Sequence, residues 1–133
     1  MSYPRSIVLI DDDDLTNHIH HSVISKLSSG LIIRVFEDAR DALRYLQGLA
    51  DAEEEFPDWI FLDINMPNMN GWEFLTEYQE LPDSSNRLYM LTSSIDDYDK
   101  SKARSFSCVD GFISKPLKID TLEGLVGEES YWT

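Results

Sequence analysis

Five polar residues follow short apolar segments at widely separated points of the chain, and together their side chains could act on a phosphoryl group. They are Asp11, Asp12, Asp63, Thr92 and Lys115. Carboxylates gathered in one cleft repel one another unless a cation lies between them, and Mg²⁺ prefers such oxygen ligands. An ammonium and a hydroxyl both suit phosphoryl oxygens, and Asp can act as a nucleophile. The set therefore predicts a Mg²⁺-dependent aspartyl-phosphate site.

The elements that must position these residues alternate between two sequence patterns. Short apolar, β-branched runs predict buried strands, whereas apolar residues three and four apart predict helices. Strands are expected at residues 6–10, 31–36, 59–62, 88–91 and 109–114. After a first helix that ends before Gly30, further helices are expected at residues 39–50, 72–81, 96–106 and 119–126. The apolar stripe of the first helix consists of Leu15, Ile19, Val23, Ile24 and Leu27.

This alternation predicts an α/β fold, with a doubly wound parallel sheet covered by helices on both faces. Ligands of such sheets bind beyond the carboxyl ends of the strands. Asp11 and Asp12 follow the first strand, and Asp63 follows the third. Thr92 and Lys115 follow the fourth and fifth strands. The five polar residues are therefore expected to meet at one edge of the sheet.

The composition narrows the classes of function. The chain has 133 residues, enough for one domain with a packed core, which we assign to residues 1–127, with a C-terminal tail at residues 128–133. A formal charge of −14 disfavours binding to nucleic acid or to an anionic membrane. The chain has no apolar run of transmembrane length. Its single cysteine, Cys108, excludes an intrachain disulfide and is consistent with a cytoplasmic location.

Four motifs carry a resemblance to a known family. They are LIDDDD at residues 9–14, LDINMPNMNGWEFL at 62–75, LTSS at 91–94 and FISKPL at 112–117. In this order and at these spacings, the chain resembles the receiver domain of two-component response regulators, specifically a single-domain regulator of the chemotaxis type. The resemblance implies a flavodoxin-like sheet of five strands in the order 2-1-3-4-5, with five helices.

The resemblance also implies an acceptor and a metal site. Asp63 would accept the phosphoryl group. Mg²⁺ would be held by Asp11, Asp12 and Asp63 together with the backbone carbonyl of Asn65. By position, Asp13 and Asp14 instead begin the first helix, where carboxylates cap amides and favour the helix dipole.

The remaining motif residues would sense and transmit phosphorylation. Thr92 would hydrogen-bond to the phosphoryl group, and Lys115 would pair with another of its oxygens. Thr92 and the aromatic Phe112 would form the switch: Thr92 moves toward the phosphoryl group, and Phe112 turns inward. The peptide bond before Pro116 is expected to be cis.

The partners implied are a sensor histidine kinase or a histidine phosphotransfer protein, and a downstream target protein. The protein would be cytoplasmic, with no nucleic acid ligand and no membrane insertion. It would be a monomer or a weak, phosphorylation-dependent homodimer. It would not be an enzyme in the ordinary sense, because it catalyses only its own phosphorylation and dephosphorylation.

Two alternatives remain open from the residues. A haloacid-dehalogenase-type phosphatase would use the Asp-x-Asp spacing of Asp11 and Asp13, but Leu15 stands where that motif has Thr or Val. A receiver-like module could instead bind partners without phosphorylation. Three histidines, His18, His20 and His21, lie close together, and His18 and His21, one helical turn apart, could ligate a metal. A polar helix face is the simpler interpretation, because no further Cys or His ligand lies nearby in the sequence. Residues 104–113 lack the alanine-rich pattern usual before the fifth strand, which predicts a loose or shifted fourth helix.

Overall fold

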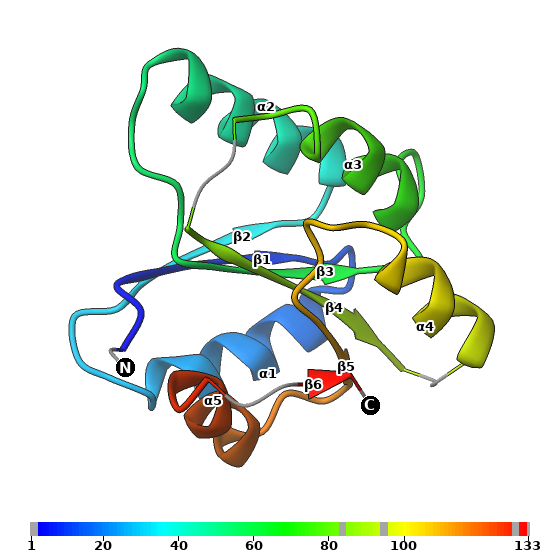
Figure 1. Ribbon diagram of the computed structural model, residues 1–133. Helices are drawn as coiled ribbons and strands as arrows, with labels where there is room; N and C mark the ends of the chain where they lie inside the picture. Colours follow the sequence, from blue (N-terminus) through cyan, green and yellow to red (C-terminus); the bar gives the residue numbers. More distant parts are fainter. Residues whose placement is uncertain (1–2, 83–84, 94–95, 129–130, 133) are drawn as a thin grey trace.

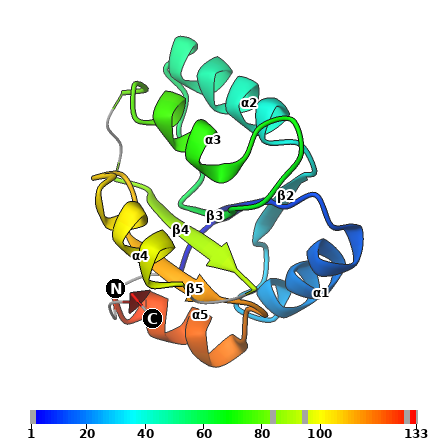
Figure 2. The ribbon, with the colours of Figure 1, turned by 90° about the vertical axis from the view of Figure 1, so that its right-hand side faces the viewer.

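The computed structural model describes residues 3–82, 85–93, 96–128 and 131–132. The strands are β1 (Ser6–Ile10), β2 (Ile32–Phe36), β3 (Trp59–Asp63), β4 (Arg87–Thr92), β5 (Gly111–Ser114) and β6 (Tyr131–Trp132). The helices are α1 (Asp14–Ser25), α2 (Ala39–Asp51), α3 (Gly71–Tyr78), α4 (Asp97–Arg104) and α5 (Ile119–Val126). The sheet lies between two helical layers, with α2, α3 and α4 on one face and α1 and α5 on the other (Figures 1 and 2).

The central strands are fully buried because helices cover both faces of the sheet. All five residues of β3 are buried, as are four of the five residues of β1. The strands pair in parallel in the order β2-β1-β3-β4-β5-β6. This confirms the predicted α/β fold and the order 2-1-3-4-5. Because every pair is parallel, the carboxyl ends of β1, β3, β4 and β5 meet at one edge of the sheet.

The sixth strand was not expected from the sequence. Tyr131 and Trp132, in the segment predicted to be a tail, pair in parallel with Gly111 and Phe112 of β5. Residues 129–130 and 133 of that segment lie outside the described residues. A Cβ atom at Gly111 would lie 2.5 Å from the carbonyl oxygen of Tyr131, so this close pairing requires a glycine. The Arg104 guanidinium lies 4.4 Å from the ring centroid of Trp132, which ties β6 to α4.

Acidic and amide side chains begin four of the helices. Asp13 caps α1 by accepting a hydrogen bond from the backbone N–H of Leu15, as its position predicts. Asp38 and Asp96 cap α2 and α4 in the same way. Asn70 and Glu73 form a reciprocal capping box that starts α3 directly after the loop that follows β3.

The buried face of α1 agrees with the predicted apolar stripe only in the second half of the helix. Leu15 and Ile19, which belong to that stripe, are 66% and 45% exposed. Ile24 and Leu27 of the stripe are buried as predicted, and Asn17 and His20 join Ile24 on the inward face. Asn17, His20 and Ile24 lie three and four residues apart and therefore share one face of the helix. The first half of α1 thus turns a polar face toward the end of β1, and its second half continues that face with apolar residues.

The fourth helix is short and polar, in agreement with the unusual sequence around it. Only Ala103 of α4 is buried. The predicted helix extended to residue 106, but α4 ends at Arg104, and Phe106 stacks on Trp72 with 6.2 Å between ring centroids. The Lys102 ammonium lies 4.8 Å from the centroid of the same indole.

Among the described residues, no helix is long and apolar enough to cross a membrane.

Candidate functional site

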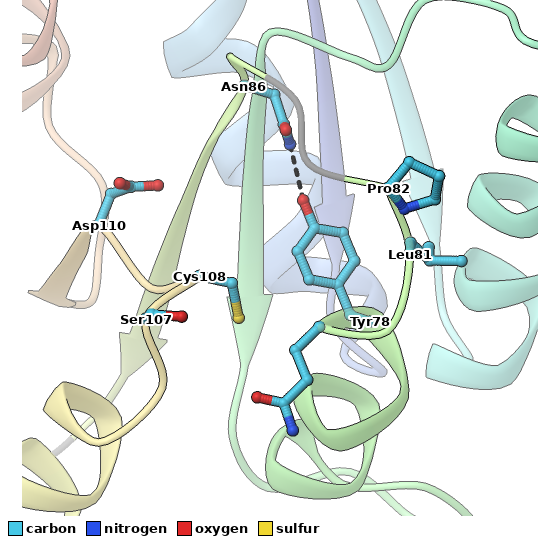
Figure 3. A pocket seen from close by; sticks show the side chains of 8 residues that line it. Tyr78, Leu81, Pro82, Asn86, Ser107, Cys108 and Asp110 are labelled. Atoms are coloured by element: carbon cyan, nitrogen blue, oxygen red, sulfur yellow. Dashed lines mark hydrogen bonds between the residues drawn. The ribbon is translucent and has the colours of Figure 1, made fainter.

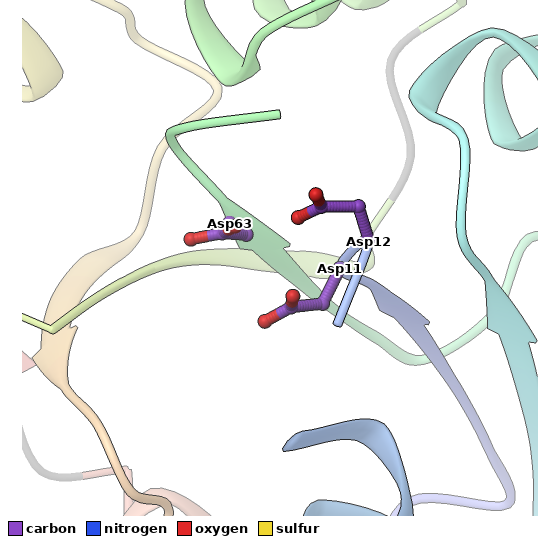
Figure 4. A group of neighbouring side chains, drawn as sticks. All are labelled: Asp11, Asp12 and Asp63. Carbon is purple, nitrogen blue, oxygen red and sulfur yellow. The ribbon is translucent and has the colours of Figure 1, made fainter. Parts of the chain in front are cut away.

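The structure brings the predicted polar residues together at the carboxyl edge of the sheet. Asp11 and Asp12 follow β1, and Asp63 is the last residue of β3. Figure 4 shows their three side chains projecting from neighbouring strand ends into the same space. Thr92 ends β4, and the backbone N–H of Lys115, just beyond β5, donates a 2.7 Å hydrogen bond to the carbonyl of Thr92. Four neighbouring strand ends therefore build the site, as the topology predicts.

The three carboxylates can act as ligands for one cation. Each offers an oxygen, and these oxygens lie within 4.8 Å of one another. Asp11 and Asp63 are buried, at 3% and 7% exposure, whereas Asp12 is exposed. Such a set of hard oxygen donors, open to solvent on one side, suits a divalent cation such as Mg²⁺ that keeps part of its water shell.

Lys115 makes side-chain contacts with two of the three carboxylates. Its Nζ donates hydrogen bonds to Oδ2 of Asp11 at 2.7 Å and to Oδ1 of Asp63 at 3.0 Å. Burial acts to lower the pKa of Lys115, but the hydrogen bonds to the two carboxylates outweigh it and raise that pKa. The lysine is therefore charged, and the three carboxylates still exceed it by two negative charges, which one divalent cation would balance.

The carboxyl group of Asp63 is destabilised in its ionised form. Burial raises its pKa, the hydrogen bond from Lys115 opposes that shift, and the negative charge of Asp11 adds to it. A carboxylate held in this way gains stability from any added positive charge. The raised pKa of Asp63 is therefore consistent with a cation bound beside this buried carboxyl group.

The loop after β3 packs closely against the backbone of Asp63. The backbone N–H of Gly71 bonds to the carbonyl of Ile64 at 2.8 Å and closes the loop. A Cβ atom at Gly71 would lie 2.7 Å from the carbonyl oxygen of Asp63, so no larger residue fits there without displacement. Asn65 lies exposed in this loop, two residues after Asp63.

The predicted switch residues lie beside the site. Thr92 is buried at the end of β4. Phe112 is completely buried and belongs to the core cluster on the sheet face that α2, α3 and α4 cover, so its aromatic group already lies inward in this structure. The Lys115–Pro116 peptide bond is cis, as expected. Ser94, the last residue of the LTSS motif, lies outside the described residues.

Two residues of α1 extend the site in a way that the sequence did not indicate. Asn17 Nδ2 donates a 2.7 Å hydrogen bond to the backbone carbonyl of Asp11. Nε2 of His20 accepts a 3.1 Å hydrogen bond from the backbone N–H of Leu117. Their signal in the sequence is weak, because polar residues three apart on a helix are typical of a solvated face.

The other candidates from the sequence do not join this cluster. Asp13 is occupied in capping α1 and in accepting a 2.9 Å hydrogen bond from the hydroxyl of Thr16. This disfavours the phosphatase that would pair it with Asp11. His18 and His21 are exposed, and among the described residues the group able to hold a metal contains neither of them.

A separate small cavity of about 120 Å³ lies at the opposite edge of the sheet, before β4 and β5 (Figure 3). Cys108 faces the ring of Tyr78 across it, and the Tyr78 hydroxyl accepts a 2.8 Å hydrogen bond from Asn86. Cys108 is half-buried, and burial raises the pKa of its thiol, so it is not an activated nucleophile.

Comparison with known proteins agrees with this geometry. The family model for the response regulator receiver domain matches residues 7–126. The response regulator Rcp1 of Synechocystis is 26% identical, with 97% of this chain and 89% of that protein covered. The chemotaxis protein CheY of Halobacterium salinarum is 26% identical, with 86% of this chain and 87% of that protein covered.

Solved structures show the same relationship. A two-component response regulator from Cytophaga hutchinsonii superposes with a TM-score of 0.83 at 30% identity, over 96% of this chain and all of that one. Sequence motifs, strand order, the acidic cluster and the family match all agree. The chain belongs to the response regulator receiver family of two-component signalling.

Proposed function

We propose that this receiver domain is switched by phosphorylation of Asp63 in the presence of Mg²⁺. The observation that carries the proposal is the position of Asp63, whose Oδ1 contacts Lys115 beside the carboxylates of Asp11 and Asp12. Transfer forms a bond between an Asp63 oxygen and phosphorus and breaks the N–P bond of a donor phosphohistidine. The displaced imidazole nitrogen keeps the electron pair of the broken bond.

The side chains divide the work of this transfer. Asp11, Asp12 and Asp63, with the backbone carbonyl of Asn65, would hold Mg²⁺, which neutralises charge on the phosphoryl oxygens. Lys115 would leave its present contact with Asp63 Oδ1 to pair with a phosphoryl oxygen. Thr92 would donate its hydroxyl to another. Hydrolysis of the acyl phosphate would reset the domain.

The readout would be a protein-binding surface. Movement of Thr92 at the end of β4 would pass to Phe112 on the adjacent strand, because β4 and β5 are paired next to each other. The face formed by α4, β5 and α5 would change as a result. The alternative is a module that binds its partner proteins without phosphorylation of Asp63.

The acidic surface and the family suggest the partners. A histidine kinase or a histidine phosphotransfer protein would supply the phosphoryl group, and a target protein in the cytoplasm would recognise the switched face. A formal charge of −14 argues against direct binding to nucleic acid. Monomers or a weak dimer that forms on phosphorylation would be the assembly state.

The test is intact mass after incubation with acetyl phosphate, with and without Mg²⁺. A gain of one phosphoryl group that requires Mg²⁺ and disappears in Asp63→Asn supports the proposal. The matched control is Asp51→Asn, since Asp51 is an exposed carboxylate at the end of α2. Steady phosphate release that survives Asp63→Asn but not Asp11→Asn would instead identify a phosphatase. If the protein neither acquires a phosphoryl group nor releases phosphate, a phosphorylation-independent binding module would be favoured.

A further inference from the structure

Helix α1 places two buried polar side chains against the functional edge of the sheet. Five polar or charged residues are buried among the described residues, and three of them, Asp11, Asp63 and Thr92, belong to the acceptor site. The other two are Asn17 and His20, at 5% and 1% exposure. Burying a polar group costs free energy unless it forms a hydrogen bond, so their inward position calls for a specific role.

His20 holds the chain just beyond Lys115. Its Nε2 accepts the backbone N–H of Leu117 at 3.1 Å, a contact between residues 97 positions apart in the sequence. Pro116 has no backbone N–H, so the next backbone donor after Lys115 is that of Leu117. His20 accepts its hydrogen bond. An accepting Nε2 must be unprotonated, and burial, followed by the nearby Lys115 charge, lowers the pKa of His20 in agreement with that.

Two anchors therefore flank the side chain of Lys115. On one side, the backbone N–H of Lys115 bonds to the carbonyl of Thr92 at 2.7 Å. On the other side, the hydrogen bond of Leu117 to His20 fixes the segment to α1. Between them, the ammonium must reach both Asp11 and Asp63 within hydrogen-bonding distance. A shift of the backbone would force the Lys115 side chain to change conformation in order to keep both contacts.

Asn17 provides the matching contact on the metal side. Its Nδ2 bonds to the carbonyl of Asp11 at 2.7 Å, one helical turn before His20. Its Oδ1 is buried without a hydrogen-bond partner in the described part of the chain. One face of α1 therefore contacts the backbone at two points of the site. Asn17 bonds to Asp11, a proposed metal ligand, and His20 bonds to the segment just after Lys115.

We propose that His20 is a positioning residue for phosphoryl transfer, which it supports by holding the Lys115–Leu117 segment so that the ammonium of Lys115 faces Asp63. The proposal rests on the role proposed above for Lys115. It goes beyond that role because it makes the rate of transfer depend on a residue of α1 that contacts neither the phosphoryl group nor the metal.

The test compares His20→Leu, which removes the acceptor, with His20→Gln, whose amide oxygen has a similar reach. His21→Leu is the matched control, because His21 is exposed on the same helix. The maximal rate of Asp63 phosphorylation by acetyl phosphate should fall about tenfold in His20→Leu, through misplacement of a charge-stabilising group. His20→Gln should recover most of that rate, and Mg²⁺ affinity should change less than about twofold in each variant, because the metal ligands are untouched.

A double-mutant cycle separates positioning from general stabilisation. In a Lys115→Ala background, His20→Leu should have no further effect on the rate, since the group that it positions is gone. An undiminished effect of His20→Leu in that background would overturn the proposal, as would an unchanged rate in His20→Leu alone. If His20→Leu does not fold, His20→Met replaces it in the same contrast with His20→Gln. A wild type that acquires no phosphoryl group would refute the proposed function itself, and with it this inference.

Discussion

Replacing Asp63 by Asn should stabilise the metal-free protein, although it removes a hydrogen-bonded ion pair. At an effective dielectric constant of about 20, Lys115 at 3.0 Å attracts the Asp63 carboxylate by about 5.5 kcal/mol. Asp11, within 4.8 Å, repels it by at least about 3.5 kcal/mol, and the solvent-exposed Asp12 repels it by about half as much. The attraction by Lys115 and the repulsion by the two aspartates are close in size. The cost of burying the Asp63 carboxylate therefore decides whether Asp63→Asn raises or lowers the free energy of unfolding.

The expected gain is about 1 kcal/mol in the free energy of unfolding, or about 4 °C in Tm for a domain of this size. The sign follows from the pKa of Asp63, which is raised in the folded state. The stability that protonated Asp63 contributes to the fold is lost as the pH rises through the pKa of the folded state, which lies above the ordinary value of 3.8. The advantage of Asp63→Asn should therefore be largest at neutral pH and should disappear in acid.

Thermal unfolding followed by circular dichroism, in chelator and then in Mg²⁺, measures this directly. Mg²⁺ at ten times its Kd should stabilise the wild type by about 1.4 kcal/mol and Asp63→Asn by clearly less. The stability advantage of the variant over the wild type should therefore become smaller or change sign. Asp51→Asn, which removes an exposed carboxylate, is the control for net charge. A lower Tm for Asp63→Asn in chelator at neutral pH would refute the electrostatic description of the site.

Three further predictions test other parts of the structure. Lys115→Met should leave the carboxylates uncompensated and cost about 3 kcal/mol of stability in chelator, measured by urea unfolding, and added Mg²⁺ should restore part of it; equal losses with and without Mg²⁺ would contradict this. Gly71→Ala should cost about 1–3 kcal/mol, because its Cβ would lie 2.7 Å from the carbonyl of Asp63; a neutral effect on Tm would show that the loop yields freely. Trp132→Ala should cost about 1 kcal/mol by removing the contact with Arg104; Trp132→Phe should retain part of it, and equal losses in the two variants would exclude the ring contact.

The central part of the fold follows from local patterns in the sequence. The apolar runs before Asp11 and Asp63 indicated strands covered on both faces, and both lie at the centre of the sheet. The placement of polar residues after the strands then brought the candidate site together, because parallel strands share one carboxyl edge. The cap at Asp13 was equally predictable from its position.

The elements that could not be predicted depend on tertiary contacts. Strand β6 is two residues long, too short for any periodicity, and it forms because Gly111 lets the backbone of Tyr131 approach. The apolar spacing of α1 indicated the buried face correctly only in the second half of the helix: Ile24 and Leu27 are buried, whereas Leu15 is exposed. In the first half, Asn17 and His20 point inward. A polar residue on a buried face becomes recognisable only when its partner, far away in the sequence, is known.

The most direct measurement of the central claim is chemical location of the phosphoryl group. Protein treated with acetyl phosphate and Mg²⁺ is reduced with borohydride, which converts an acyl-phosphorylated aspartate to homoserine, and the digest is read by tandem mass spectrometry. The structure predicts homoserine at position 63 and unchanged aspartate at positions 11, 12 and 13. Homoserine at position 11 or 13, with Asp63 unchanged, would contradict the assignment of Asp63 as the acceptor.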